Sequence, residues 1–379
     1  MTIEMRAVGI VLDSVGCGNA RDADAYGDSG ADTLGKIFAH EKIQLPNLAR
    51  LGLYDILREN NAMIPASPDL IPGSQATRLH EASAGKDTTT GHWELAGAIT
   101  TIPFATFPTF PPDLIVDIEE RANVKFIGNV ISSGTAVIED FGEQHLVEGK
   151  PILYTSVDSV MQIAAHEESF GLERLYAVCR NAREVIDERG IRIGRVIARP
   201  FLGAHPQDFT RTAGRRDFSL TPPRLMMQDL QDQGVDVIGI GKIADIFCNM
   251  GISESHPTKS NADGMKSIEK IWRENRQQSH FIFANLVDFD MLYGHRRDAV
   301  GYAKALEQFD QWLGEFLREI REDDFLFITA DHGNDPYFSG TDHTREAVPL
   351  LTLHAPMPLR DNENFTYVAE LVKRHFGIF

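Results

Sequence analysis

Three aspartates and three histidines spread along the chain supply carboxylates and imidazoles, the side-chain types that hold catalytic divalent metal ions. They are Asp13, Asp290, His295, Asp331, His332 and His343. This mixed oxygen and nitrogen set suits manganese, zinc or iron better than calcium, and it lacks the thiolates that structural zinc prefers. Two such ions would add about four positive charges, so an acidic pocket would become a receptor for phosphate.

Each of these residues also has an ordinary structural interpretation. An aspartate at the end of a strand commonly caps a helix or a turn, and a single histidine is commonly a hydrogen-bonded structural residue. Several candidates, however, follow separate predicted strands that one fold would bring together. The spacing therefore indicates a site for two metal ions without excluding the structural interpretation.

A threonine-rich segment supplies the candidate nucleophile. Residues 83–94 read Ser-Ala-Gly-Lys-Asp-Thr-Thr-Thr-Gly-His-Trp-Glu, which favours a tight loop or the start of a helix. A hydroxyl in contact with a divalent metal loses its proton more easily and can attack phosphorus near neutral pH. The pattern does not choose among Thr88, Thr89 and Thr90, and the threonines could instead only cap a helix. The residue order of a Walker loop is absent.

The elements that must position these residues are predicted strands. Near-continuous apolar runs at residues 7–12, 235–240, 281–287 and 325–330 lead into candidate site residues. Such runs, without alternation, favour parallel strands covered on both faces. Apolar positions at three- and four-residue steps between residues 300 and 320 predict a helix. The alternation predicts an α/β fold, in which ligands bind beyond the carboxyl ends of the strands.

The middle of the chain is predicted to be an inserted domain. Two proline-rich stretches, at residues 103–112 and 222–223, resist regular structure on either side of it. Between them lie strand-like runs at residues 152–155 and 195–201 and a helix-like stretch at residues 172–186. We therefore expect a split core of residues 1–101 and 221–379 that carries a smaller α/β cap at residues 102–220.

Composition limits the partners and the compartment. The net charge of −18 repels nucleic acid and anionic lipid, and it makes local cations necessary if the substrate is a phosphate ester. The three cysteines, Cys17, Cys179 and Cys248, contain no CxxC pair, so neither a disulfide framework nor a thiolate zinc site is indicated. The first apolar run is too short to span a membrane. The sequence favours a cytoplasmic protein.

Six long segments in order resemble the phosphopentomutase family, within the alkaline phosphatase superfamily. They are residues 11–16, 85–94, 154–160, 194–201, 286–298 and 329–335. The short motif Asp331-His332-Gly333 alone would indicate only the superfamily. The resemblance spans essentially the whole chain and implies an alkaline phosphatase-like core, with a mostly parallel sheet flanked by helices.

The resemblance also implies roles for individual residues. One metal ion, manganese in this family, would be held by Asp290, His295 and His343, and the other by Asp13, Asp331 and His332. Thr88 would stand beside the second ion and carry the phosphate, which chooses among the three threonines. The residues facing the sugar phosphate would be Asp158, Arg195, Arg211 and Lys242. His92 and His166 are expected to be structural or to support the ligands, and Asp288 to support Asp290 by hydrogen bonds.

The implied reaction interconverts the 1-phosphate and 5-phosphate of ribose and 2-deoxyribose. It proceeds through phosphothreonine and a pentose 1,5-bisphosphate, and a pentose or glucose bisphosphate could serve as the activator. A closing cap would exclude water, which would otherwise hydrolyse the phosphothreonine. The sequence leaves three alternatives: a phosphatase or a phosphoglycerate mutase with the same metal set, and a protein that binds metals without chemistry.

Overall fold

The computed structural model describes residues 4–18, 20–59, 61, 64–156, 159–274 and 276–379, and the chain divides into two compact units. Unit 1 comprises Met1–Thr101 with Pro222–Phe379, and unit 2 comprises Ile102–Thr221. The second boundary lies one residue after the end that we predicted for the cap, next to the proline pair. Among the described residues, no helix is both long and apolar enough to cross a membrane.

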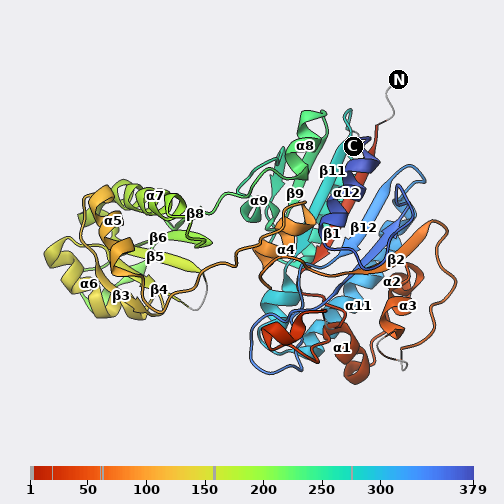
Figure 1. The fold of residues 1–379 in the computed structure, drawn as a ribbon, viewed down its shortest axis with the longest axis horizontal. Helices are drawn as coiled ribbons and strands as arrows, with labels where there is room; N and C mark the ends of the chain where they lie inside the picture. The colour runs from red at the N-terminus through yellow and green to blue at the C-terminus, as the bar shows by residue number, and fades with distance from the viewer. Residues whose placement is uncertain (1–3, 19, 60, 62–63, 157–158, 275) are drawn as a thin grey trace. The chain divides into compact units, whose positions relative to one another are not determined.

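Unit 1 is built on a seven-stranded sheet (Figure 1). In spatial order its strands are β10 (Glu254–His256), β9 (Asp236–Ile240), β11 (His280–Leu286), β1 (Arg6–Leu12), β12 (Phe325–Thr329), β13 (Val348–Leu353) and β2 (Ser74–Leu79). The strands from β10 to β12 run parallel, and β13 is antiparallel to both of its neighbours. The four apolar runs are β1, β9, β11 and β12, so the predicted α/β fold with a mostly parallel sheet is confirmed.

Helices flank this sheet (Figure 1). The α-helices of unit 1 are α1 (Thr33–Glu41), α2 (Pro46–Arg50), α3 (Leu53–Arg58), α4 (Thr88–Leu95), α8 (Met226–Asp232), α9 (Ile243–Ile246), α10 (Asn261–Trp272), α11 (Ala299–Phe316) and α12 (Thr366–His375). Shorter turns are the 3-10 helices η1 (Ala23–Tyr26) and η5 (Leu317–Glu319) and the π-helix η4 (Phe289–Gly294). α11 packs with α1 and α2, whereas α4 packs with α9 and α12.

The helix predicted at residues 300–320 is α11 followed by η5. The Asp298 side chain caps α11 by accepting from the backbone N–H of Gly301. Leu306, Phe309 and Leu313 are buried on one face, as the period requires. The α-helix ends four residues before the predicted end, where a 3-10 turn replaces its last turn.

Unit 2 has its own mixed six-stranded sheet. Its strands are β3 (Ile127–Ile131), β4 (Ile152–Thr155), β5 (Val160–His166), β6 (Arg195–Leu202), β7 (Thr210–Arg211) and β8 (Arg216–Ser219). Its helices are α5 (Pro112–Ala122), α6 (Ala136–Glu148), η2 (Glu167–Gly171), α7 (Leu172–Glu188) and η3 (Pro206–Asp208). α5 and α7 cover one face over one apolar cluster, and α6 lies over a second cluster on the other face (Figure 1).

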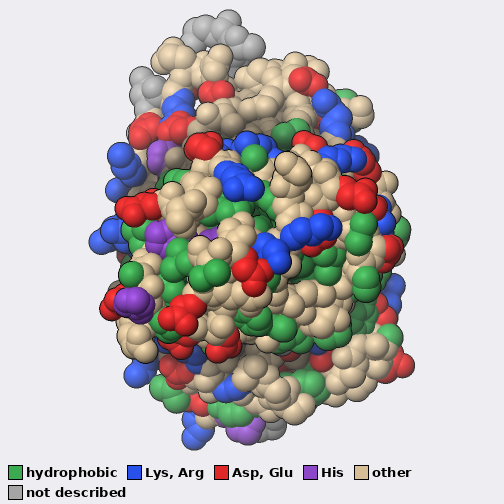
Figure 2. All heavy atoms as spheres, turned by 90° about the vertical axis from the view of Figure 1, so that its left-hand side faces the viewer, with side chains coloured by type: hydrophobic (Ala, Val, Ile, Leu, Met, Phe, Trp, Pro, Cys, Tyr) green, Lys and Arg blue, Asp and Glu red, His purple; other side chains and the backbone are tan. Residues whose placement is uncertain are grey.

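Charged side chains of both signs mix on the face of the molecule drawn in Figure 2. Lys and Arg alternate there with Asp and Glu, and apolar side chains lie between them in small groups. The excess negative charge of the chain therefore does not form one continuous acidic patch on that face.

The central strand β1 depends on a glycine. A Cβ atom at Gly9 would lie 2.1 Å from Cζ of Phe327, its register partner on β12. We predict that Gly9→Ala lowers the unfolding free energy by about 1–3 kcal/mol through overpacking, measured by thermal denaturation. Adding Phe327→Leu opens space for the new methyl group, so the double variant should lose less stability than the sum of the two single variants. Additive losses would contradict this explanation.

Candidate active site

Three neighbouring parallel strands deliver the candidate residues to one edge of the sheet. Asp13 follows β1, Asp331 follows β12, and η4 carries Asp290 just after β11. The chain turns sharply after β1, since Ser14 has φ 72°, and its backbone N–H donates to Oδ1 of Asp331 at 3.0 Å. The ends of β1 and β11 stay paired, because the N–H of Asp13 donates to the carbonyl of Leu286 at 3.2 Å. The carboxyl edge of the sheet therefore gathers side chains that lie far apart in the sequence.

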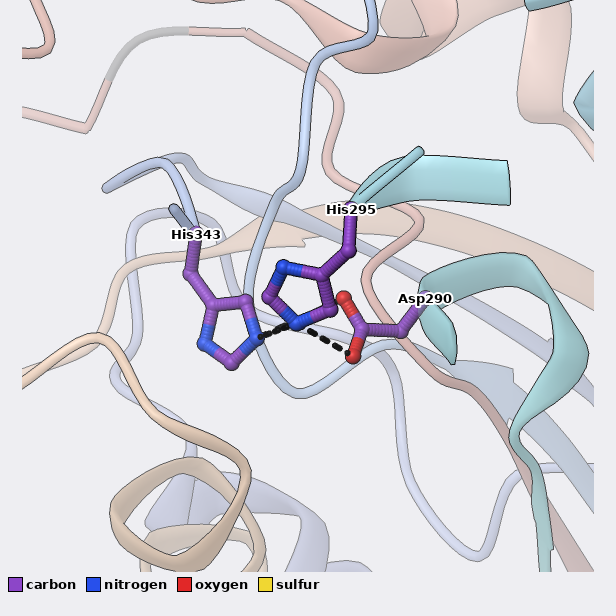
Figure 3. A group of neighbouring side chains, drawn as sticks. All are labelled: Asp290, His295 and His343. Atoms are coloured by element: carbon purple, nitrogen blue, oxygen red, sulfur yellow. Dashed lines mark hydrogen bonds and ion pairs between the residues drawn. The ribbon is translucent and has the colours of Figure 1, made fainter. Parts of the chain in front are cut away.

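Asp290, His295 and His343 form the first group, in which each side chain points toward the other two (Figure 3). The Nε2 atoms of the two histidines lie 3.1 Å apart, and each lies within 3.4 Å of a carboxylate oxygen of Asp290. Nδ1 of His295 donates to the carbonyl of Thr341 at 2.7 Å, and Nδ1 of His343 donates to that of Lys86 at 2.9 Å. These bonds leave the two Nε2 atoms facing a shared point, as metal ligation requires.

The second group is Asp13, Asp290 and His332, all buried. Nε2 of His332 lies 3.5 Å from Oδ1 of Asp13, while its Nδ1 donates to the carbonyl of Gly333 at 3.0 Å. Asp290 thus belongs to both groups, which the spacing did not predict. Asp331, which the resemblance places with Asp13 and His332, lies outside the tightest cluster, but its Oδ2 is 3.4 Å from Nε2 of His332.

The start of α4 brings a hydroxyl to the second group. Asp87 caps the helix by accepting from the N–H groups of Thr89 and Thr90. Oγ1 of Thr88 lies 3.1 Å from Nε2 of His332, whereas Oγ1 of Thr90 turns inward and donates to Asp87. A Cβ atom at Gly91 would lie 2.1 Å from the carbonyl oxygen of Asp331, so a glycine is needed for α4 to approach β12 so closely. The geometry favours Thr88.

The charges of the site fit divalent cations. Burial, and then repulsion by Asp331 and Asp290, raises the pKa of Asp13 well above its usual value. Burial opposes ionisation of Asp290, but its contacts to His295 and His343 outweigh burial and lower its pKa. Within the described chain, Oδ1 of Asp13 is buried without a hydrogen-bond partner. Crowded carboxylates, one with an unpaired oxygen, beside two imidazole Nε2 atoms that face a shared point, are the donors that divalent metal ions prefer.

Amide side chains support the carboxylates, and the sequence analysis did not identify them. Nδ2 of Asn285 donates to Asp13 at 2.9 Å, and Nδ2 of Asn334 donates to Asp290 at 2.8 Å. Asn285 is a polar residue inside the apolar run of β11, and this exception was a signal that could have been used. His92, expected to be structural or supporting, is buried with Nδ1 2.9 Å from the carbonyl of Thr88 and 3.1 Å from Asp331.

Two arginines hold the loops that carry the site. Arg297 donates to the carbonyls of Gly294, Gly340 and Asp342 and to Oδ1 of Asn334, so it joins η4 to the loop before His343. Arg345, which is fully buried, donates to Glu81 and to the carbonyl of Gly85. It thereby fixes the loop that leads to Thr88.

The predicted substrate residues lie in both units. Lys242 in unit 1 is exposed just after β9, at the carboxyl edge of the sheet. In unit 2, Arg195 opens β6 and Arg211 forms part of β7, and both are exposed. Asp158 lies outside the described residues. Asp288 accepts from the N–H of Asn261, at the start of α10, at 2.7 Å; this bond is not to Asp290, which Asp288 was expected to support.

The chain is similar to known proteins over nearly its whole length. A family model described as the metalloenzyme superfamily matches residues 5–378. Phosphopentomutase from Symbiobacterium thermophilum is 50% identical over 361 residues, covering 94% of this chain and 90% of that protein. Phosphopentomutase from Syntrophotalea carbinolica is 50% identical over 349 residues, covering 91% and 87%. The solved PH0037 protein from Pyrococcus horikoshii has a TM-score of 0.51 at 12% identity, covering 99% and 98%, which shows a shared fold.

Metal binding should release protons at neutral pH. Contact with Asp290 raises the pKa of His295 to about 9, so its imidazole carries a proton at pH 7 in the metal-free protein. An imidazole must lose its proton before it can bind a metal ion, so binding displaces that proton from His295, and the affinity for manganese should rise with pH up to about 9. Calorimetry in buffers of different ionisation enthalpy counts the protons. His295→Gln should release about one proton fewer than the wild type; equal release by both proteins would refute the assignment.

Arg297 should control metal affinity without contacting the ion. Arg297→Met removes the bonds that join η4 to the loop before His343, so the affinity for at least one manganese ion should fall by about 10- to 100-fold. Arg296→Met is the matched control, because this neighbouring arginine is exposed. Manganese titration of both variants gives the comparison. If Arg297→Met binds both manganese ions with wild-type affinity, the hydrogen bonds of Arg297 do not position the metal ligands.

Proposed function

The chain belongs to the phosphopentomutase family, within the alkaline phosphatase-like metalloenzyme superfamily, and we propose that it interconverts ribose 1-phosphate and 2-deoxyribose 1-phosphate with the 5-phosphates. Membership makes the protein a metal-dependent isomerase that moves a phosphate group. The observation that carries the finer proposal is the Thr88 hydroxyl, 3.1 Å from Nε2 of His332 and beside a cluster of ligand side chains. A hydroxyl in this place can accept and return a phosphoryl group.

We propose that the two groups hold two divalent ions, manganese by family resemblance. One would be held by Asp290, His295 and His343, and the other by Asp13, His332 and Asp331, with Asp290 near enough to contribute to both. The ions, when bound, neutralise phosphate charge and lower the pKa of a nearby hydroxyl. Oδ1 of Asp13, which has no hydrogen-bond partner among the described residues, supports this assignment.

The phosphoryl group would then be transferred to and from the side chain of Thr88. In the active form Thr88 carries a phosphate on Oγ1, and a hydroxyl of the pentose phosphate attacks that phosphorus in line. The bond from phosphorus to Oγ1 breaks as the bond to the sugar oxygen forms, and the sugar's proton leaves as Thr88 regains one. The pentose 1,5-bisphosphate then returns its other phosphate to Thr88 by the reverse steps. His92 and Asp87 would fix Thr88, because they hold its carbonyl and cap its helix.

Recognition of the sugar phosphate falls to the basic residues. We propose that Arg195 and Arg211 in unit 2 and Lys242 in unit 1 bind phosphate, the arginines through paired hydrogen bonds and the lysine as a point charge. Asp158 keeps its proposed role on resemblance alone. A pentose or glucose bisphosphate as activator and a cytoplasmic location likewise remain proposals.

Thr88→Ala should abolish phosphoryl transfer. We expect interconversion of ribose 1-phosphate and ribose 5-phosphate to fall at least about 10³-fold, because the acceptor oxygen is gone. Intact-protein mass spectrometry after incubation with ribose 1,5-bisphosphate should show one added phosphate in the wild type, localised to Thr88, and none in the variant. Thr89→Ala, which removes the adjacent hydroxyl, should keep both the activity and the added phosphate.

Three outcomes would overturn the proposal. Release of free phosphate from ribose 1-phosphate, without ribose 5-phosphate, would identify a phosphatase. Interconversion of phosphoglycerates in place of pentose phosphates would identify a different mutase. An active Thr88→Ala variant would exclude Thr88 as the nucleophile.

A further inference from the structure

A buried glutamate outside the ligand set joins three segments of unit 1. Glu346, three residues after His343, is only 1% exposed. Its Oε2 accepts from the backbone N–H groups of Thr33 at 2.8 Å and Gly18 at 3.3 Å. Its Oε1 accepts from the hydroxyls of Thr33 at 2.7 Å and Thr344 at 2.6 Å. One carboxyl group therefore holds together the loop after β1, the start of α1 and the loop that carries His343.

Two glycines leave the room that this carboxyl group occupies. A Cβ atom at Gly16 would lie 2.4 Å from Oε2 of Glu346, and a Cβ atom at Gly333 would lie 2.4 Å from Oε1. Gly16 is three residues after Asp13, and Gly333 directly follows His332. The carboxyl group thus packs between the segments that follow two members of the second group of ligands.

The hydroxyl of Thr33 connects Glu346 to the aspartate that belongs to both groups. Its Oγ1 donates to Glu346 and accepts from the backbone N–H of Asn334 at 3.2 Å. The side-chain amide of Asn334 in turn donates to Oδ1 of Asp290 at 2.8 Å. Movement of Glu346 would therefore disturb the residue that orients Asp290.

The hydroxyl of Thr344 connects Glu346 to two histidines. Thr344 directly follows His343, and its backbone pairs with that of Gly333 through bonds of 2.8 and 3.1 Å. Because Gly333 directly follows His332, this short antiparallel bridge fixes the backbone beside both imidazoles. The bond of 2.6 Å between the Thr344 hydroxyl and Oε1 of Glu346 ties the bridge to the buried carboxyl group.

These hydrogen bonds do not require a negative charge on Glu346. Burial raises the pKa of Glu346 to about 8, so the carboxyl group is mostly protonated at pH 7. The N–H groups at Oε2 can only donate, so the proton belongs on Oε1, where both partners are hydroxyls that can accept. A glutamine can make the same bonds, with its oxygen toward the N–H groups and its NH₂ toward the hydroxyls. An aspartate keeps a carboxyl group but is one methylene shorter.

We propose that Glu346 is a positioning residue that holds the ligands of both metal ions in place through these hydrogen bonds. It fixes the loop after Asp13 and the amide that supports Asp290. It also fixes the paired backbone beside His332 and His343. The inference rests on the two metal ions of the proposed function. Because these ligands belong to both groups, loss of the bonds should weaken both sites together.

The test separates the reach of the side chain from its charge. Glu346→Gln keeps the reach and removes the charge, whereas Glu346→Asp keeps the charge and loses the reach. Each full-length variant and the wild type are titrated with manganese in a calorimeter at neutral pH. We expect Glu346→Gln to bind both ions within about threefold of the wild type, and Glu346→Asp to bind both about 10- to 100-fold more weakly.

Two results would overturn this inference. One is wild-type affinity for both ions in Glu346→Asp. The other is an equal loss in Glu346→Gln and Glu346→Asp, since the charge would then be what the site needs. If thermal denaturation finds Glu346→Asp unfolded, Thr33→Val takes its place, because it removes one hydroxyl bonded to Glu346 and keeps a side chain of the same size. Thr33→Val should weaken manganese binding about 2- to 10-fold, and wild-type affinity would again contradict the inference.

Asp310→Ala is the matched control for a general loss of stability. Asp310 on α11 is also a buried carboxylate with a pKa raised by burial, and it accepts from the backbone N–H groups of Asn47 and Leu48 at the start of α2. The variant should unfold at a lower temperature than the wild type and bind manganese with wild-type affinity. If it loses as much manganese affinity as Glu346→Asp, lost stability explains both results and the inference is wrong.

The inference and the proposed function can fail separately. If the wild type isomerises ribose 1-phosphate and Glu346→Asp keeps its affinity for both ions, the positioning role is wrong and the function stands. If the wild type binds two manganese ions but does not isomerise pentose phosphates, and Glu346→Asp binds both ions weakly, the positioning role stands and the function is wrong. A wild type that binds fewer than two manganese ions would overturn both.

Discussion

Mutual repulsion among buried carboxylates is the constraint on which the site depends. Asp13, Asp290 and Asp331 lie at the ends of adjacent elements, shielded from water that would otherwise stabilise their charges. Charges of one sign in a poorly polarisable interior cost free energy unless cations or donors compensate them. The amides of Asn285 and Asn334 compensate only in part, and Oδ1 of Asp13 has no hydrogen-bond partner in the described part of the chain. Binding of divalent ions would relieve this repulsion, and the free energy recovered would contribute to metal affinity. The rigid sheet keeps the carboxylates from moving apart.

The surrounding structure can be understood as a means of keeping these groups close. Pairing of β1 with β11 and β12 sets the spacing of three strand ends, and Gly91 lets α4 approach β12. Arg297 and Arg345 then fix two loops that have no regular structure, one before His343 and one before Thr88. Arginine suits this task because its planar group donates to several backbone carbonyls at once. The sheet thus fixes the positions of the site residues at its edge, and the hydrogen bonds of Arg297 and Arg345 fix those on the loops.

The strands and the helix that could be predicted from the sequence are those whose burial requires apolar residues. Strands covered on both faces must be apolar along their length, so β1, β9, β11 and β12 stood out, as did the periodic helix α11. The sequence could not show that β13 runs antiparallel, because Val348–Leu353 is equally apolar in either direction. Likewise, nothing in three adjacent threonines reveals which hydroxyl turns toward His332. The position of Asp290 in both groups depends on distances between separate elements, which no local pattern encodes.

The two-cation site beside Thr88 that we propose depends on the gathering of these repelling carboxylates with the imidazoles. The most direct measurement is anomalous X-ray diffraction, at the manganese absorption edge, from crystals grown with manganese. We expect two peaks, one in contact with Asp290, His295 and His343 and one in contact with Asp13 and His332. A single peak, or manganese bound away from these side chains, would contradict it.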